Sequence, residues 1–187
     1  ACGDESEPEE STTTASPIDR STESSSSSES STSSGSDTSS GDGSGGDSEL
    51  PDDLPAEARE NTKEGAAAFG EYYLLTYGEA AKTGNVQTLQ GLATEDCSVC
   101  TKAEQGIQGD KAKGWKRDKN PYKINKASAT KRPDEGYKVR MDVSVAKHHR
   151  IDSNGDVNAD IDATDYTVTE HVVWVDGRWQ MMDWIVT

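Results

Sequence analysis

The alternation of apolar and polar residues is clearest near the end of the chain, where it predicts a β-hairpin. Residues 166–186 are rich in β-branched and aromatic residues and contain the pair Asp176-Gly177. This pair favours a two-residue turn because both of its positions adopt positive φ. In the resulting register, Val168 faces Ile185. One face is then expected to belong to the core: Tyr166, Val168, Val172, Trp174, Trp179, Met181 and Ile185.

Two acidic residues interrupt that apolar face. The same register places Glu170 directly opposite Asp183, and like charges in facing positions destabilise an antiparallel pair. One interpretation is a β-bulge or a different pairing that moves one carboxylate away. The other is a polar pocket in which burial and mutual repulsion raise at least one carboxyl pKa, as in a general acid or base. Glu170 and Asp183 are therefore the candidate catalytic residues.

Patterns of period two also occur upstream of the hairpin. Strands are expected over residues 122–131, 137–151, 157–175 and 178–186, which gives a sheet of about four antiparallel strands. The pair Asn154-Gly155 predicts a second type I′ turn within this region.

The first part of the folded region has helical periodicity. Between Pro55 and Lys82, apolar and small residues recur every three or four positions, which places them on one helix face. Asn61 followed by Glu64 resembles a capping box, so the helix is expected to restart there. The left-handed conformation favoured by Gly84 should end it.

Two shorter helices are expected after this first one. The first covers residues 86–93. The second extends from about Cys97 to Lys113, with Thr94 or Asp96 as its N-cap. The order of elements is helices followed by strands, which is typical of the α+β class.

The beginning of the chain has a different composition. Residues 3–50 consist mainly of Ser, Gly, Thr, Asp and Glu with two large apolar residues, so we expect a disordered tether. Residues 1–54 carry a net charge of −13, whereas residues 55–187 carry −3. The second segment therefore has the length and the nearly neutral charge of a single domain. It lacks the basic stripe that nucleic-acid binding needs.

The three cysteines divide into a pair and a single residue. In an exported protein the close pair Cys97 and Cys100 is expected to form a disulfide, although a redox pair at a helix N-terminus is an alternative. The opening Ala1-Cys2-Gly3 resembles the end of a lipobox in bacterial lipoproteins. We therefore expect residues 1–2 to be a lipobox remnant, with Cys2 lipidated and the protein anchored at the extracytoplasmic face of the cell membrane.

One segment has the spacing of a calcium loop. Oxygen-bearing side chains occupy every second position at Asp152, Asn154, Asp156, Asn158 and Asp160. However, Val157 stands where the loop needs glycine, and Ala163 stands where it needs glutamate. A hairpin tip is thus the first interpretation and calcium the alternative. The histidines have no zinc spacing, and no cofactor is predicted.

Several short motifs resemble a family of actinobacterial lipoproteins of unknown function. The resemblance covers about residues 55–187 and rests on Thr62-Lys63-Glu64-Gly65-Ala66-Ala67-Ala68-Phe69, Tyr72-Tyr73, Thr83-Gly84-Asn85, Cys97-Ser98-Val99-Cys100 and Trp174-Val175-Asp176-Gly177-Arg178-Trp179. It implies a nuclear-transport-factor-2-like cone, in which a curved sheet wraps a long helix. It also implies a pocket bordered by Phe69, Tyr73, Tyr77 and Trp179.

Because one fold supports many functions, the resemblance does not fix an activity. We expect a surface-anchored, non-enzymatic module that binds an unidentified small molecule or a cell-envelope protein. The first alternative is an isomerase- or dehydratase-like enzyme that uses Glu170 or Asp183 as a general base. The second is a calcium-stabilised adhesion module.

Overall fold

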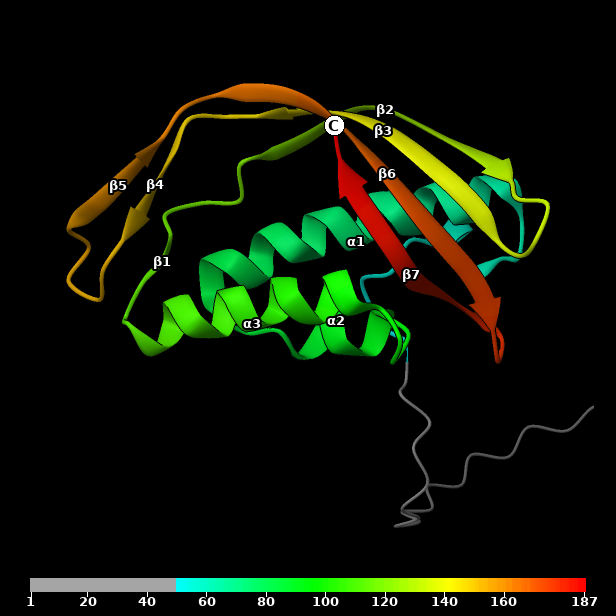
Figure 1. The fold of residues 1–187 in the computed structure, drawn as a ribbon, viewed down its shortest axis with the longest axis horizontal. Helices are drawn as coiled ribbons and strands as arrows, with labels where there is room; N and C mark the ends of the chain where they lie inside the picture. The colour runs from blue at the N-terminus through cyan, green and yellow to red at the C-terminus, as the bar shows by residue number, and fades with distance from the viewer. Residues whose placement is uncertain (1–49) are drawn as a thin grey trace, which may run out of the picture. The chain divides into compact units, whose positions relative to one another are not determined.

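The computed structural model describes residues 50–187, so the predictions for Cys2 and for the tether up to residue 49 lie outside the described residues. Helices precede strands in the chain, as expected (Figure 1). The elements are η1 (Glu57–Arg59), α1 (Lys63–Thr83), α2 (Gln87–Leu92), α3 (Ser98–Ala112), β1 (Lys116–Arg117), β2 (Tyr122–Lys131), β3 (Tyr137–Val145), β4 (His148–Ile151), β5 (Val157–Ile161), β6 (Thr164–Val175) and β7 (Arg178–Val186).

Two antiparallel sheets form from the strands. The larger sheet has the order β2-β3-β6-β7, and the smaller has the order β1-β4-β5. The larger sheet curves over α1, which packs mainly against β2 and β3, while α2 and α3 lie on the other side of α1 (Figure 1). The predicted α+β class, with helices packed on a curved antiparallel sheet, is confirmed.

The two long predicted strands are each interrupted. Residues 137–151 break at Ala146-Lys147 into β3 and β4, and residues 157–175 break at Asp162-Ala163 into β5 and β6. The prediction of continuous strands was wrong because β4 and β5 leave the larger sheet: β4 pairs with β1 on one side and with β5 on the other. Periodicity continues across such a break because each part remains extended.

Helix α1 ends where the sequence predicts but begins one residue later. Thr62, not Asn61, is the N-cap, and its hydroxyl accepts a hydrogen bond from the Gly65 backbone N–H at 2.9 Å. Gly84 adopts a φ of 73° at the C-terminus, as predicted. The expectation of Thr94 or Asp96 as the N-cap of α3 was wrong, since Cys97 takes that position.

The predicted disulfide between Cys97 and Cys100 is confirmed, with an S–S distance of 1.99 Å. Both cysteines are buried, and Cys97 Sγ accepts a hydrogen bond from the Cys100 backbone N–H at 3.3 Å. The disulfide therefore fixes the first turn of α3, while the buried position removes both sulfur atoms from solvent.

The terminal hairpin has the predicted turn but a different register beyond it. Asp176 and Gly177 have positive φ of 49° and 78°, as a type I′ turn requires. At the other predicted type I′ turn only Gly155 has positive φ, so that prediction was wrong. Pairing of β6 with β7 matches the expectation as far as Val172 and Met181, and then a bulge intervenes.

The bulge changes which residues face the core. Met182 has no partner in β6, so His171 faces Asp183 and Glu170 faces Trp184. The simple register that paired Glu170 with Asp183 was therefore wrong, and the alternative interpretation, a β-bulge that moves one carboxylate away, is confirmed. One extra residue reverses the orientation of every later side chain. Val168 faces Val186 rather than Ile185, and Ile185 is 53% exposed instead of buried. Sequence alternation could not locate this extra residue.

None of the helices within residues 50–187 is both long enough and apolar enough to cross a bilayer.

Candidate functional site

The bulge leaves Glu170 alone inside the core. Its side chain is 2% exposed, and its Oε2 atom has no hydrogen-bond partner within the described part of the chain. Gly70 of α1 lies so close that an added methyl group would overlap Oε2. Burial raises the pKa of Glu170 well above its usual range. Burial therefore favours the neutral form of the carboxyl.

Asp183 lies on the other face of β7 and is exposed. Its Oδ1 accepts a hydrogen bond from the Trp184 backbone N–H at 2.9 Å. Glu170 and Asp183 thus do not form an acid/base pair. Glu170 also lines none of five prominent pockets on the surface of residues 50–187.

The four residues expected around a pocket have separate surroundings. Phe69 and Tyr73 are 1% and 3% exposed, and neither lines any of the five pockets. Burial raises the pKa of the Tyr73 phenol, and the nearby Glu170 adds to the increase. These two residues fill the space that the resemblance assigned to a cavity. Trp179 borders two of the pockets and Tyr77 borders a third.

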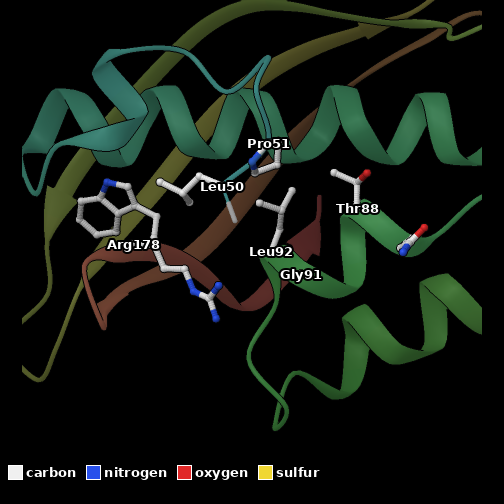
Figure 2. Close-up of a pocket in the computed structure, with 8 residues that line it drawn as sticks. Leu50, Pro51, Thr88, Gly91, Leu92 and Arg178 are labelled. Atoms are coloured by element: carbon white, nitrogen blue, oxygen red, sulfur yellow. The ribbon is translucent and has the colours of Figure 1, made fainter. Parts of the chain in front are cut away.

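The pocket beside Trp179 has a volume of about 360 Å³ and lies between the start of the described chain, α2 and the beginning of β7. Figure 2 shows Leu50 and Leu92 facing each other across it. Trp179 itself is 2% exposed, and its indole N–H donates to the Glu60 carbonyl at 2.9 Å. This pocket is therefore a shallow, mixed apolar and polar depression with a rigid aromatic wall.

A group of polar aromatic residues surrounds an arginine near the C-terminal end of α1. We call it the Arg117 cluster, and its members come from α1, β1, β2, β6 and β7: Tyr77, Arg117, Tyr122, Tyr166 and Trp184. The Tyr77 ring lies 6.0 Å from the Tyr122 ring and 5.9 Å from the Trp184 ring. Elements distant in sequence thus meet at Tyr77.

The arginine of this cluster is held by aromatic groups. One of its N–H groups donates to the Tyr122 hydroxyl at 2.7 Å, and its guanidinium carbon lies 5.5 Å from the Tyr77 ring centre. Burial opposes the charge of Arg117, but Tyr122 and Tyr77 outweigh it and raise the pKa. Among residues 50–187, Arg117 forms no ion pair with a carboxylate.

The cluster also contains a donor without a partner among residues 50–187. The Trp184 indole nitrogen is buried and has no hydrogen-bond partner within residues 50–187. Buried polar atoms are nearly always hydrogen-bonded, so such an exception needs an explanation. Two donor groups, Arg117 and Trp184, therefore contact the same tyrosine ring, and neither is paired with a carboxylate of the described chain.

A pocket of about 350 Å³ opens beside this cluster. We call it the Arg117 pocket, and it lies between α1, α3 and β1. Its lining consists of small, apolar and charged residues: Tyr77, Ala81, Lys102, Ala103, Gly106, Ile107, Asp110 and Arg117. Sequence analysis did not single out Arg117, Tyr122 or Trp184, because no local pattern shows that β1 brings Arg117 against two distant strands.

The residues of the calcium pattern form the hairpin of β4 and β5. Asp152 accepts hydrogen bonds from the backbone N–H groups of Asn154 and Asp156 at 2.8 and 3.0 Å. Asn158 accepts from Arg150 at 2.8 Å, and Asp160 pairs with His149 at 2.9 Å. Across residues 50–187, no group of three or more His, Cys, Asp and Glu side chains is placed to hold a metal ion.

The geometry defines an α+β module with an aromatic, cationic pocket between its helices and its sheets. The sequence profile of a family of unknown function, DUF6318, matches residues 51–184. The chain therefore belongs to that family. No curated protein sequence matches it.

Several solved structures are similar to this chain at low sequence identity. The intermembrane space region of the chloroplast protein ARC6 is 16% identical with a TM-score of 0.53, covering 68% of this chain and 97% of that one. A protein of unknown function with a cystatin-like fold from Nostoc punctiforme is 11% identical, with a TM-score of 0.38 and coverages of 62% and 85%. Aln2 from a Streptomyces species is 9% identical, with a TM-score of 0.41 and coverages of 63% and 85%. At these identities the likeness concerns the fold alone.

Proposed function

We propose that residues 50–187 form a non-catalytic binding module, which a lipid on Cys2 holds at the outer face of the cell membrane. The observation that carries the binding role is the Arg117 pocket, in which a cation and small residues border an open space. Pockets of this size with a few convergent polar groups are the usual form of small-molecule sites.

The position of Glu170 supports a non-catalytic role. A general base must lie within hydrogen-bond reach of its substrate, either directly or through one water molecule. Glu170 is buried against Gly70 and Tyr73, and none of the five pockets reaches it. The open pockets instead contain groups suited to recognition, such as the Arg117 guanidinium.

Membrane attachment can be tested on the native protein. Mass spectrometry of the N-terminal peptide should find acyl chains on Cys2, and the protein should sediment with membranes. Cys2→Ser should release it, whereas the matched variant Cys97→Ala/Cys100→Ala should remain membrane-bound. An unmodified Cys2 in a membrane-free protein would contradict the anchor but not the pocket.

One observation favours an enzyme as the second candidate. Glu170 combines a raised pKa with an unpartnered oxygen, which is the state of several catalytic carboxyl groups. Catalysis would require α1 to separate from the sheet at Gly70. Hydrogen exchange of the backbone amides around Gly70 tests this opening. Exchange as slow as that of the β3 core supports the binding module, and rapid local exchange supports the enzyme.

A further inference from the structure

We propose that the Arg117 pocket binds a small organic monocarboxylate, with the Arg117 guanidinium as its counter-ion. This inference rests on the proposed binding function and adds the chemical class of the ligand. It is carried by three features: a cation of the pocket with no carboxylate partner, an unused neutral donor in the adjoining Arg117 cluster, and a pocket space bordered by small and apolar side chains.

The first feature concerns charge. Removing a cation from water is unfavourable unless an anion or several hydrogen bonds compensate. Arg117 interacts with the hydroxyl groups of Tyr122 and Tyr77 and with the faces of both rings. It has no carboxylate partner from residues 50–187. One guanidinium N–H donates to Tyr122, and a guanidinium has further N–H groups that match the two oxygens of a carboxylate. A carboxylate ligand would therefore complete the site.

The second feature is the indole N–H of Trp184. It is buried without an acceptor from residues 50–187, and its ring packs on Tyr77, the residue that also contacts Arg117. An acceptor near Tyr77 would satisfy this donor directly or through a water molecule. Arg117 and Trp184 are therefore two donors near Tyr77 that are not paired with a carboxylate of residues 50–187, and an anion can accept from such donors.

The third feature is the shape of the pocket wall. Ala81, Ala103 and Gly106 have small side chains, and a methyl group added at Gly106 would meet no atom within 4 Å. Ile107 provides buried apolar surface at the same place. A ligand with a short hydrocarbon part can thus lie along α3 while its carboxylate reaches Arg117.

Asp110 and Lys102 narrow the choice of anion. Both line the pocket from α3, so one positive charge and one negative charge border its opening. Together with Arg117 the lining carries two positive charges and one negative charge, a net charge of +1. One carboxylate neutralises this charge, whereas a dianion such as inorganic phosphate would leave an uncompensated negative charge beside Asp110. The pocket is therefore expected to select a singly charged carboxylate with an apolar tail.

The test uses the full-length protein and three probes: sodium hexanoate, sodium benzoate and inorganic phosphate at equal ionic strength. Nuclear magnetic resonance should show shifts of the Arg117 Nε–H and Trp184 indole signals with hexanoate or benzoate, but not with phosphate. Arg117→Gln should weaken binding roughly tenfold or more, since a charge-assisted hydrogen bond is lost. Arg117→Lys should lose less binding affinity than Arg117→Gln, because the positive charge remains.

Gly106→Leu provides a test that does not alter the cluster. A leucine on this exposed helix position occupies the pocket mouth and favours the helix, so the fold should persist. It should abolish carboxylate binding. Gly109→Leu on the same helix is the matched control and should bind as the wild type does.

Three outcomes would overturn the proposal. They are the absence of binding by both carboxylates, equal binding of phosphate, and unchanged affinity in Gly106→Leu. If Arg117→Gln fails to fold, as judged by circular dichroism, Gly106→Leu decides the question. Failure of carboxylate binding would leave the membrane attachment of Cys2 unaffected, so the two hypotheses fail separately.

Discussion

Two ionisable side chains pack against α1, Glu170 fully buried and Arg117 half-buried, and their surroundings differ. Glu170 lies beside Gly70, and Arg117 lies beside Tyr77, seven residues or about two helical turns further along α1. Glu170 has an unpartnered oxygen in a closed core, whereas Arg117 has aromatic partners and borders a pocket. An incomplete set of partners therefore has one meaning for a fully buried polar group and another for a half-buried one.

The difference depends on access. A sealed group with a missing partner lowers the stability of the fold, because nothing from solution can reach it. A group beside an opening can be completed by a ligand, which then stabilises the folded state by binding to it. We therefore expect changes near Glu170 to alter stability alone, and changes near Arg117 to alter binding. Variants in each region test this division.

The largest expected effect comes from Gly70→Ala. Its methyl group would overlap Glu170 Oε2 and would lie 3.0 Å from Val139 Cγ1. Overpacking of this kind typically costs up to about 3 kcal/mol, measurable by urea unfolding. Gly106→Ala is the matched control, since its methyl group meets no atom within 4 Å, and it should stabilise the helix by up to about 1 kcal/mol.

A double variant shows whether the contact with Glu170 causes the loss of stability in Gly70→Ala. Gly70→Ala combined with Glu170→Ala should be more stable than the sum of the two single effects predicts, because the shortened side chain leaves room for the methyl group. Strict additivity would show that Glu170 does not contact position 70.

The second effect is the pH dependence of Glu170→Leu. The folded-state pKa of Glu170 is raised. Ionising this carboxyl therefore costs more free energy in the folded protein than in the unfolded chain. Wild-type stability should therefore fall as pH rises from the ordinary glutamate range toward the raised pKa. The leucine variant should lack this fall and be more stable than the wild type at pH 8 by about 2 kcal/mol.

The same comparison at pH 4 provides the control. There the wild-type carboxyl is neutral in both the folded and the unfolded state, so the advantage of leucine should shrink. A constant difference between pH 4 and pH 8, from thermal or urea unfolding, would contradict the raised pKa of Glu170.

The sequence predicted local elements better than the contacts between them. The helix end at Gly84 and the turn at Asp176-Gly177 were predictable because each depends on the backbone preference of glycine or its neighbour. The breaks at residues 146–147 and 162–163 were not, because they depend on which strand each segment finds as a partner. Pairing is a tertiary property that alternation does not encode.

The candidate site shows the same limit. Glu170 was singled out correctly as a charged residue on an apolar face, but the bulge at Met182 placed Asp183 outside. Arg117 was missed because its importance comes from Tyr77 and Tyr122, which only the fold brings to it. A sequence can thus show that a charged residue interrupts an apolar pattern, whereas the access of solvent to that residue requires the structure.

The third effect concerns the disulfide at the start of α3, the helix that forms one wall of the Arg117 pocket. Cys97→Ala/Cys100→Ala removes a link between residues three positions apart. For such a short loop the loss of chain entropy predicts a destabilisation of about 1.5–2 kcal/mol. Carboxylate binding should weaken, while the pH dependence attributed to Glu170 should not change. A changed pH dependence would show that the two regions are coupled.

The smallest expected effect, under about 0.5 kcal/mol, comes from Asp183→Asn, because this residue is exposed. Its Oδ1 accepts from the Trp184 N–H, and asparagine retains that oxygen. The variant nevertheless tests the register of β7 in solution. Without the bulge at Met182, Asp183 would face Glu170, and removal of its charge would lower the pKa of Glu170 and flatten the decline of stability with pH. With the bulge, urea unfolding of Asp183→Asn between pH 4 and pH 8 should follow the wild-type curve, because the two carboxyl groups lie on opposite faces of the sheet.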